Sequence, residues 1–141
     1  MRFGIVVAEW NPDITLAMYE SATKTLEKYG VKKENIKTVH APGSYELPMV
    51  AQMLAEKKCY HAIICLGCII QGETKHFDFI AESVANGIQH VGLKYNTPVI
   101  FGVLTPNNMQ QAKDRSGGKY GNKGEDAAIA AIKMANLQKT I

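Results

Sequence analysis

The stretch from Gly67 to Phe79 combines residues that can bind an anion with one that can move a proton. It reads Gly-Cys-Ile-Ile-Gln-Gly-Glu-Thr-Lys-His-Phe-Asp-Phe. Gly72 ends an apolar run, and Thr74 can cap the helix that we expect to follow. Such a turn leaves backbone N–H groups unpaired at a helix start, which carries about half a positive elementary charge. We therefore predict an anion-binding turn here.

The same turn lacks a cation of the kind that phosphate-binding loops use. Its glycines fall close to the spacing of the nucleotide-triphosphate P-loop, but Glu73 stands where that loop has its lysine. This departure disfavours a nucleotidase. The turn can still bind a smaller phosphate ligand if another part of the protein supplies the cation. Arg115 is the first candidate, because its planar guanidinium suits bidentate phosphate binding, and Lys123 is the second. From spacing alone, however, solvated surface charges are a better interpretation of both residues than phosphate ligands.

Three more residues admit both a functional and a structural interpretation. His76 follows the turn and can transfer protons near neutral pH, since imidazole has an ordinary pKa of about 6.5, or it can simply pack against the helix. Trp10 can stack on a planar heterocycle or cover the sheet edge. Glu46 can bind the hydroxyls of a polyol chain or favour the dipole of its helix. Both interpretations stay open for each residue.

Strands and helices alternate along the chain and must position these residues. The pattern predicts an α/β protein, a three-layer flavodoxin-like fold with a mainly parallel sheet of about four strands flanked by helices. The predicted strands are Arg2 to Ala8, Ile36 to His40, a run from Ala62 to Leu66, and Pro98 to Leu104. The predicted helices run from an N-cap at Asp13 to Tyr29, from Tyr45 to Lys57, from His76 to about Asn96, from Asn107 or Asn108 to Lys113, and from Gly124 to Lys139.

The C-terminal part of the chain carries two further expectations. Glycines between Gly117 and Gly124 predict a flexible link. The last helix is alanine-rich and has four larger apolar residues available for packing, Ile129, Ile132, Met134 and Leu137.

Ligands of open α/β sheets bind beyond the carboxyl ends of the strands, near a switch in strand order. In this sequence that rule selects four places. They are Trp10 with Asn11, Ser44 to Glu46, Cys68 to His76, and the segment just after Phe101.

Length and composition bound the class of protein. With 141 residues, of which 46% are hydrophobic, we expect a single domain over residues 1–141. The 16 Lys and Arg residues against 13 Asp and Glu give a scattered net charge of +3, which argues against a nucleic-acid partner. The sequence has no signal-peptide layout and no membrane-spanning run, so we expect a cytoplasmic protein without a membrane partner.

The three cysteines form no regular disulfide framework, which suits a reducing compartment. Cys65 and Cys68 spell C-x-x-C, but we expect both on one strand, where residues three apart face opposite sides and lie roughly 10 Å apart. That separation is too great for a disulfide. We interpret them as small buried hydrophobic residues, and a redox or zinc site is the weaker interpretation.

Five segments taken together resemble the lumazine synthase family, whose members catalyse the penultimate step of riboflavin biosynthesis. Any one of them is weak evidence, but in order they cover essentially the whole chain and are highly specific. They are Val-Ala-Glu-Trp-Asn at 7–11, Pro-Gly-Ser-Tyr-Glu-Leu-Pro at 42–48, Gly-Cys-Ile-Ile-Gln-Gly-Glu-Thr-Lys-His-Phe-Asp at 67–78, Pro-Val-Ile-Phe-Gly-Val-Leu-Thr at 98–105, and Arg-Ser-Gly-Gly-Lys-Tyr-Gly-Asn-Lys-Gly at 115–124.

The resemblance implies a transferase that condenses 5-amino-6-(D-ribitylamino)uracil with 3,4-dihydroxy-2-butanone 4-phosphate to 6,7-dimethyl-8-ribityllumazine. Phosphate and water are released, and no metal or organic cofactor is implied. The implied partners are these small-molecule substrates and further copies of the chain. The family forms homopentamers, in some members assembled as a hollow icosahedral shell, with each active site shared between adjacent subunits.

Carried onto matching positions, the resemblance also implies roles for individual residues. His76 takes the position of the proton-transfer residue, and Trp10 that of the aromatic that stacks on the pyrimidine. The backbone of Glu73 and Thr74 is offered to the phosphate. The ring and ribityl chain are held by Ser44, Tyr45, Glu46, Cys68, Ile69 and Ile70, and a neighbouring subunit contributes Phe101, Arg115 and Lys123.

Two departures from the family pattern bear on ligand and assembly. Trp10 is commonly phenylalanine, and its larger ring suggests that flavin is retained as well as substrate. The chain begins almost at its first strand, without the N-terminal arm of many relatives, whereas the link from Gly117 to Gly124 has a shell-compatible length. Pentamer and shell both stay open. The alternative functions are a flavodoxin-like module that binds flavin or phosphate without turnover, and a shell-forming assembly protein.

Overall fold

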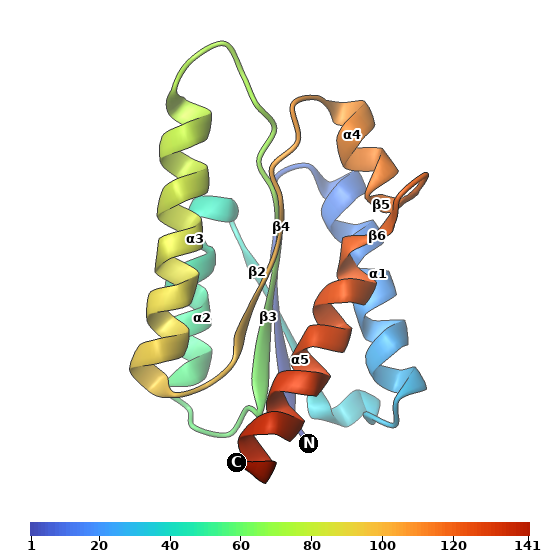
Figure 1. The fold of residues 1–141 in the computed structure, drawn as a ribbon, viewed down its shortest axis with the longest axis vertical. Helices are drawn as coiled ribbons and strands as arrows, with labels where there is room; N and C mark the ends of the chain where they lie inside the picture. Colours follow the sequence, from blue (N-terminus) through green and yellow to red (C-terminus); the bar gives the residue numbers. More distant parts are fainter.

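The computed structural model describes all residues from Met1 to Ile141 and contains a parallel sheet covered by helices (Figure 1). Its four strands lie in the order β2-β1-β3-β4, and each neighbouring pair is parallel. The predicted α/β class and four-stranded sheet are confirmed. The strands are β1 (Phe3–Ala8), β2 (Ile36–Ala41), β3 (Ala62–Cys68) and β4 (Val99–Leu104).

Helices cover the sheet in two layers. The odd-numbered residues of β1 pack with α1 and α5 on one face of the sheet. Val6 and Ala8 pack with α2 and α3 on the other face. This alternation follows from the pleat of the strand, and the burial of every residue of β1 and β3 explains their continuous apolar sequences. The helices are α1 (Pro12–Lys28), α2 (Leu47–Ala55), α3 (His76–Tyr95), α4 (Met109–Asp114) and α5 (Lys123–Thr140).

Helix α1 begins two residues earlier than predicted. Asn11 is its N-cap residue, in a left-handed conformation with φ of 58°, and Pro12 is the first helical residue. Asp13 therefore lies in the first turn, and its prediction as N-cap is wrong. Proline explains the difference, because its fixed φ and missing N–H suit the first helical position.

The helix predicted from Tyr45 to Lys57 is shorter than expected. The chain first forms a 3₁₀ turn at Ser44–Glu46, and α2 itself covers only Leu47–Ala55. Pro48 lies in the first turn of α2, as expected. The tighter 3₁₀ turn holds the Ser44 side chain against β3.

The glycine-rich segment after α4 is a hairpin, so the prediction of a flexible link is wrong. Strands β5 (Ser116–Gly118) and β6 (Gly121–Asn122) pair antiparallel. Gly117 and Gly121 have φ of 115° and 81°, a region that glycine occupies without steric cost. The glycines thus serve the geometry of the turn.

Helix α5 packs mainly through small residues, and of its larger apolar residues Ile132 packs against the core beneath it. Met134 and Leu137 are 44% and 47% exposed, while Ile129 and Ile132 are half-buried. Small side chains let α5 lie close to α1, which bulkier ones would prevent. The buried face consists of Gly124, Ala127, Ala128, Ala131 and Ala135.

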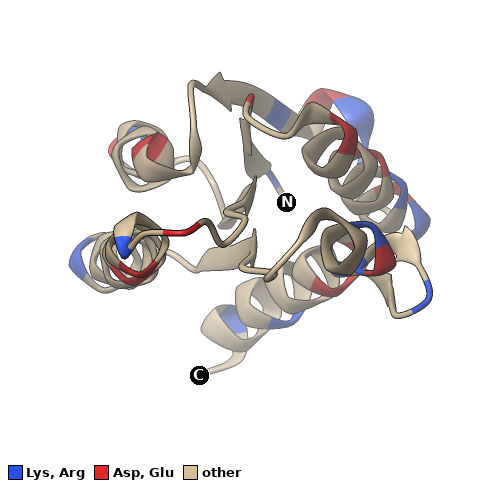
Figure 2. Cartoon of the chain, turned by 90° about the horizontal axis from the view of Figure 1, so that it is seen from above, with Lys and Arg blue, Asp and Glu red and all other residues tan.

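The outer surfaces of the helices carry Lys and Arg interspersed with Asp and Glu (Figure 2). This mixture matches the scattered charge of the sequence. None of the helices has the length and apolar character needed to cross a membrane.

We expect Gly124→Ala to destabilise the protein by about 2 kcal/mol, the usual cost of overpacking. A Cβ at this position would overlap the backbone carbonyl of Met18 in α1, and that clash outweighs the gain of about 1 kcal/mol in helix propensity. The measurement is the midpoint of denaturant unfolding. Gly72→Ala is the matched control, because no atom lies within 4 Å of a Cβ built there. Equal midpoints for both variants would contradict this packing.

Candidate active site

Three loops meet where β1, β2 and β3 end. Strands β2 and β3 flank β1, so the strand order switches at this point, as it does at ligand sites of open α/β sheets. Trp10 follows β1, the Ser44–Glu46 turn follows β2, and Cys68 ends β3. Asn11 joins two of the loops, because its Nδ2 donates to the Cys68 carbonyl oxygen at 3.1 Å.

Trp10 and Glu46 converge on Gly43. A Cβ at Gly43 would lie 3.0 Å from Trp10 Cδ1 and 3.1 Å from Glu46 Oε1. The Trp10 side chain is 71% exposed. Tyr45, which directly precedes Glu46 in the sequence, is also exposed. An open indole next to a carboxylate can stack on a heterocycle while the carboxylate accepts hydrogen bonds from hydroxyl groups.

Ser44 is buried between the 3₁₀ turn and β3. Its Oγ has no hydrogen-bond partner and lies so close to Gly67 that a Cβ there would be 2.6 Å away. The hydroxyl therefore faces the sheet, and the backbone is the part of Ser44 that can reach a ligand. Ile69 and Ile70 continue from β3 and are half-buried.

The predicted anion-binding turn lies between β3 and α3. Glu73 and Thr74 are exposed in this turn, and Lys75 is the N-cap residue of α3. The Thr74 hydroxyl accepts a hydrogen bond from the His76 backbone N–H at 3.3 Å, so threonine does cap the helix start, although from one residue further out. His76 is the first helical residue and is exposed, which leaves its ring accessible to a ligand at the turn.

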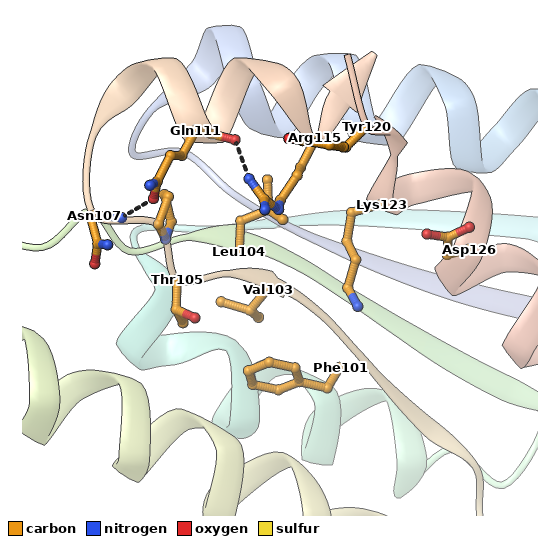
Figure 3. A pocket seen from close by; sticks show the side chains of 11 residues that line it. Phe101, Val103, Leu104, Thr105, Asn107, Gln111, Arg115, Tyr120, Lys123 and Asp126 are labelled. Carbon is orange, nitrogen blue, oxygen red and sulfur yellow. Dashed lines mark hydrogen bonds between the residues drawn. The ribbon is translucent and has the colours of Figure 1, made fainter. Parts of the chain in front are cut away.

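A second group of predicted residues lines a separate cavity of about 560 Å³ beside β4. Phe101 projects from β4, which is an edge strand, and Arg115 and Lys123 face the cavity from above it (Figure 3). Two cations over an aromatic floor suit a phosphorylated or otherwise anionic ligand.

The β5–β6 hairpin brings the two cations together. Arg115 precedes the hairpin and Lys123 follows it, and the Lys123 backbone N–H donates to the Arg115 carbonyl oxygen at 2.8 Å. The Arg115 Nη1 also donates to the Gln111 carbonyl oxygen at 3.4 Å (Figure 3). Spacing along the sequence does not reveal that the two cations lie together, because it does not show the hairpin that joins them.

The cavity also contains residues that the sequence analysis did not select. Gln111 lies one helical turn before Arg115, and Tyr120 lies between Arg115 and Lys123 in the segment already matched to the family. Their positions relative to Arg115 and Lys123 are the sequence signal by which Gln111 and Tyr120 could have been predicted. The residues missed in this way are Asn107, Gln111, Tyr120 and Asp126, whereas Thr105 lies in the segment after Phe101 that the sequence analysis selected.

The chain thus brings the predicted site residues into two groups and does not unite them. The cavity with Arg115 and Lys123 is lined from β4, α4, the hairpin and α5, and it includes no residue of the Trp10, Ser44 and His76 loops. In the single chain, the anion-binding turn and its predicted cation belong to different surfaces.

The two thiols of the C-x-x-C pattern lie in different cores. Cys65 belongs to the core under α2 and α3, and Cys68 to the core under α1 and α5, so the prediction that they face opposite sides is confirmed. Burial raises the pKa of the Cys65 thiol to about 12 and the pKa of the Cys68 thiol to about 11. Both remain protonated and unreactive near neutral pH.

Comparison with known proteins decides the family. A family model described as 6,7-dimethyl-8-ribityllumazine synthase matches residues 1–139. The chain belongs to the lumazine synthase family. The predicted resemblance is confirmed.

Relatives from this family align along nearly the whole chain. The synthase of Cytophaga hutchinsonii is 60% identical over 99% of this chain and 86% of its own length. That of Parabacteroides distasonis is 54% identical over 97% and 86%, and that of Bacteroides fragilis 49% identical over 97% and 96%. A solved de novo designed Rossmann fold protein is 20% identical, with a TM-score of 0.42 over 80% of this chain and 91% of its own.

In this lumazine synthase family member, we expect Gly67→Ala to displace the Ser44–Glu46 turn and to lower stability by about 2 kcal/mol. Ser44→Ala alone should leave stability unchanged or slightly higher, because it removes a buried hydroxyl without a partner. Since Ser44 Oγ is the atom nearest to the new Cβ, the double variant should recover part of the loss. Strictly additive unfolding free energies would contradict this contact.

We also expect one fast-reacting thiol in the folded protein at pH 8. Cys59 is partly exposed, whereas Cys65 and Cys68 are buried and have raised pKa values. A colorimetric thiol reagent should therefore label one cysteine rapidly and all three after unfolding. Cys59→Ser is the control and should abolish the fast phase. Rapid native labelling of a second thiol would disprove the buried assignment.

Proposed function

We propose that this chain is a 6,7-dimethyl-8-ribityllumazine synthase of riboflavin biosynthesis. The reaction is the condensation of 5-amino-6-(D-ribitylamino)uracil with 3,4-dihydroxy-2-butanone 4-phosphate, with release of phosphate and water. The observation that carries the proposal is the family match over residues 1–139, together with relatives of this name at up to 60% identity. The loops at the ends of β1, β2 and β3 suit the pyrimidine substrate, and the turn before α3 together with the Arg115 cavity suits the phosphorylated one.

The first group suits the pyrimidine substrate. Trp10 offers an open aromatic face for the ring, and the Glu46 carboxylate beside it can accept hydrogen bonds from the ribityl hydroxyls. The backbone of Ser44, Tyr45 and Cys68 to Ile70 borders the same place. These contacts would hold the reacting amino group near the end of β3.

The turn before α3 and the Arg115 cavity together suit the phosphorylated substrate. The Glu73 and Thr74 backbone at the start of α3 can hold phosphate oxygens, and Arg115 with Lys123 can supply the positive charge. Imine formation, phosphate loss and ring closure each require protons to move between nitrogen, carbon and oxygen. His76, exposed at the same turn, is the residue we assign to that transfer.

We propose that the active site is shared between adjacent copies of the chain in a homopentamer, which in turn can build a larger shell. The separation of His76 from the Arg115 cavity supports this, because one chain alone does not place them together. Exposed apolar side chains around the edge of β4 also favour association. Among them are Leu93, Met134 and Leu137. The three free thiols favour a cytoplasmic location.

The direct test is an assay with both substrates, in which lumazine absorbance should rise while phosphate appears. A chain that binds riboflavin or phosphate but gives no product would instead be a flavodoxin-like binding module. A chain that assembles but neither binds nor turns over would be a shell protein. Either result would overturn the enzyme assignment.

We expect Arg115→Ala to lower kcat/KM for the phosphorylated substrate by about a hundredfold or more, since two charge-assisted hydrogen bonds contribute about 1.5–3 kcal/mol each. Arg115→Lys should recover part of this loss, because it restores the charge without the bidentate geometry. Steady-state kinetics at a saturating pyrimidine concentration measure both. Unchanged kinetics in Arg115→Ala would remove this residue from the site.

We expect His76→Ala to lower kcat by about a hundredfold, the lower end of what a proton-transfer residue contributes, because the condensation proceeds partly unaided. Mixing the two slow variants, His76→Ala and Arg115→Ala, followed by dissociation and reassembly, should then raise activity well above that of either variant alone. In random rings about a quarter of the interfaces would combine an intact His76 with an intact Arg115. No recovery in mixed assemblies of confirmed native mass would contradict a shared site.

A further inference from the structure

Tyr120 is placed to hold the Arg115 side chain. Its ring centroid lies 4.9 Å from Arg115 Cζ, within the range of a cation–π contact, and the ring is itself 60% exposed. Lys119 Nζ lies 5.2 Å from the same centroid. Figure 3 shows Tyr120 and Arg115 side by side at the wall of the cavity.

The backbone around Tyr120 is fixed to the same turn that carries Arg115. The Tyr120 N–H donates to the Asp114 carbonyl oxygen at 2.7 Å. Gly118 lies so close to the end of α4 that a Cβ there would be 2.7 Å from the Lys113 carbonyl oxygen. The hairpin is therefore packed onto the end of α4. This contact fixes the backbone of Tyr120 relative to the backbone of Arg115.

A fixed guanidinium matters for anion binding. A free arginine side chain has many rotamers, and ordering it on binding lowers affinity. The Tyr120 ring restrains one face of the Arg115 group, while the Gln111 carbonyl oxygen accepts from Nη1 at 3.4 Å. The remaining N–H groups stay available to oxygens of a ligand in the cavity.

We propose that Tyr120 is a positioning residue that preorganises Arg115 for the phosphate group of the substrate. The proposal rests on the proposed function for the identity of that substrate. The phosphate contact itself belongs to Arg115, and Tyr120 acts through it. Replacing the aromatic face should weaken phosphate recognition and leave the pyrimidine side of the site unaffected.

The test compares Tyr120→Leu, which removes the aromatic face, with Tyr120→Phe, which retains it. In Tyr120→Leu, KM for the phosphorylated substrate should rise about two- to fivefold, the size of an exposed cation–π contact. KM for the pyrimidine should stay within error, and Tyr120→Phe should retain most of the wild-type value. In an Arg115→Ala background, Tyr120→Leu should have no further effect.

The matched control is Tyr29→Leu. Tyr29 is 57% exposed and has Lys28 Nζ 5.6 Å from its ring, so it is a similar pair outside the cavity. This variant should leave both KM values unchanged. Native mass measured for every variant reports whether the assembly persists. If Tyr120→Leu raises neither KM in an intact assembly, or raises it equally with and without Arg115, the proposal is overturned.

Inorganic phosphate provides a readout that does not depend on turnover. By calorimetry, phosphate affinity should fall in Tyr120→Leu by the same two- to fivefold as KM rises, and it should be retained in Tyr120→Phe. If the wild type makes no lumazine but phosphate affinity still depends on Tyr120 through Arg115, the proposed function fails and the positioning role stands. If the wild type is active and phosphate affinity ignores Tyr120, the positioning role fails alone.

Discussion

The parallel pairing of β1 with β2 on one side and β3 on the other is the interaction on which the rest of the structure depends. Because these strands run in the same direction, the loops that leave them emerge at one edge of the sheet. Because the order switches at β1, those loops diverge and leave space for a ligand between them. The same pairing buries β1 and β3 on both faces, so one arrangement provides both the core and the place for chemistry.

A second constraint is electrostatic. The turn before α3 offers backbone N–H groups to an anion but carries Glu73, and Arg115 and Lys123 are held together by a hairpin beside β4. A phosphate dianion needs more compensation than a helix start provides. In the proposed assembly a neighbouring chain supplies it, so association and catalysis would depend on the same contacts. Arg115 then binds the phosphate more tightly when its side chain is held in place, which connects the hairpin to recognition.

The sequence was sufficient for most of the fold because its signals are local. Continuous apolar runs indicated the strands, and helical spacing indicated α1, α3 and α5, with differences of only a few residues at their ends. It was insufficient where the outcome depended on a partner distant in sequence. The Gly117 to Gly124 segment looked mobile until its pairing and its contact with α4 were visible. The larger apolar residues of α5 were available for packing, but the fully buried face of the helix consists of alanine and glycine.

By itself, the sequence determined the α/β class, the family and the chemical types available for catalysis, because periodicity and motif spacing are properties of the chain alone. Only the tertiary structure decided how those types are grouped. It joined Arg115 with Lys123 and Tyr120, kept them apart from His76, and turned the Ser44 hydroxyl inward against Gly67. The physical reason is that each of these relations is a contact between side chains and backbone of different elements. Their distances are set by how helices and strands pack, which spacing along the chain does not encode.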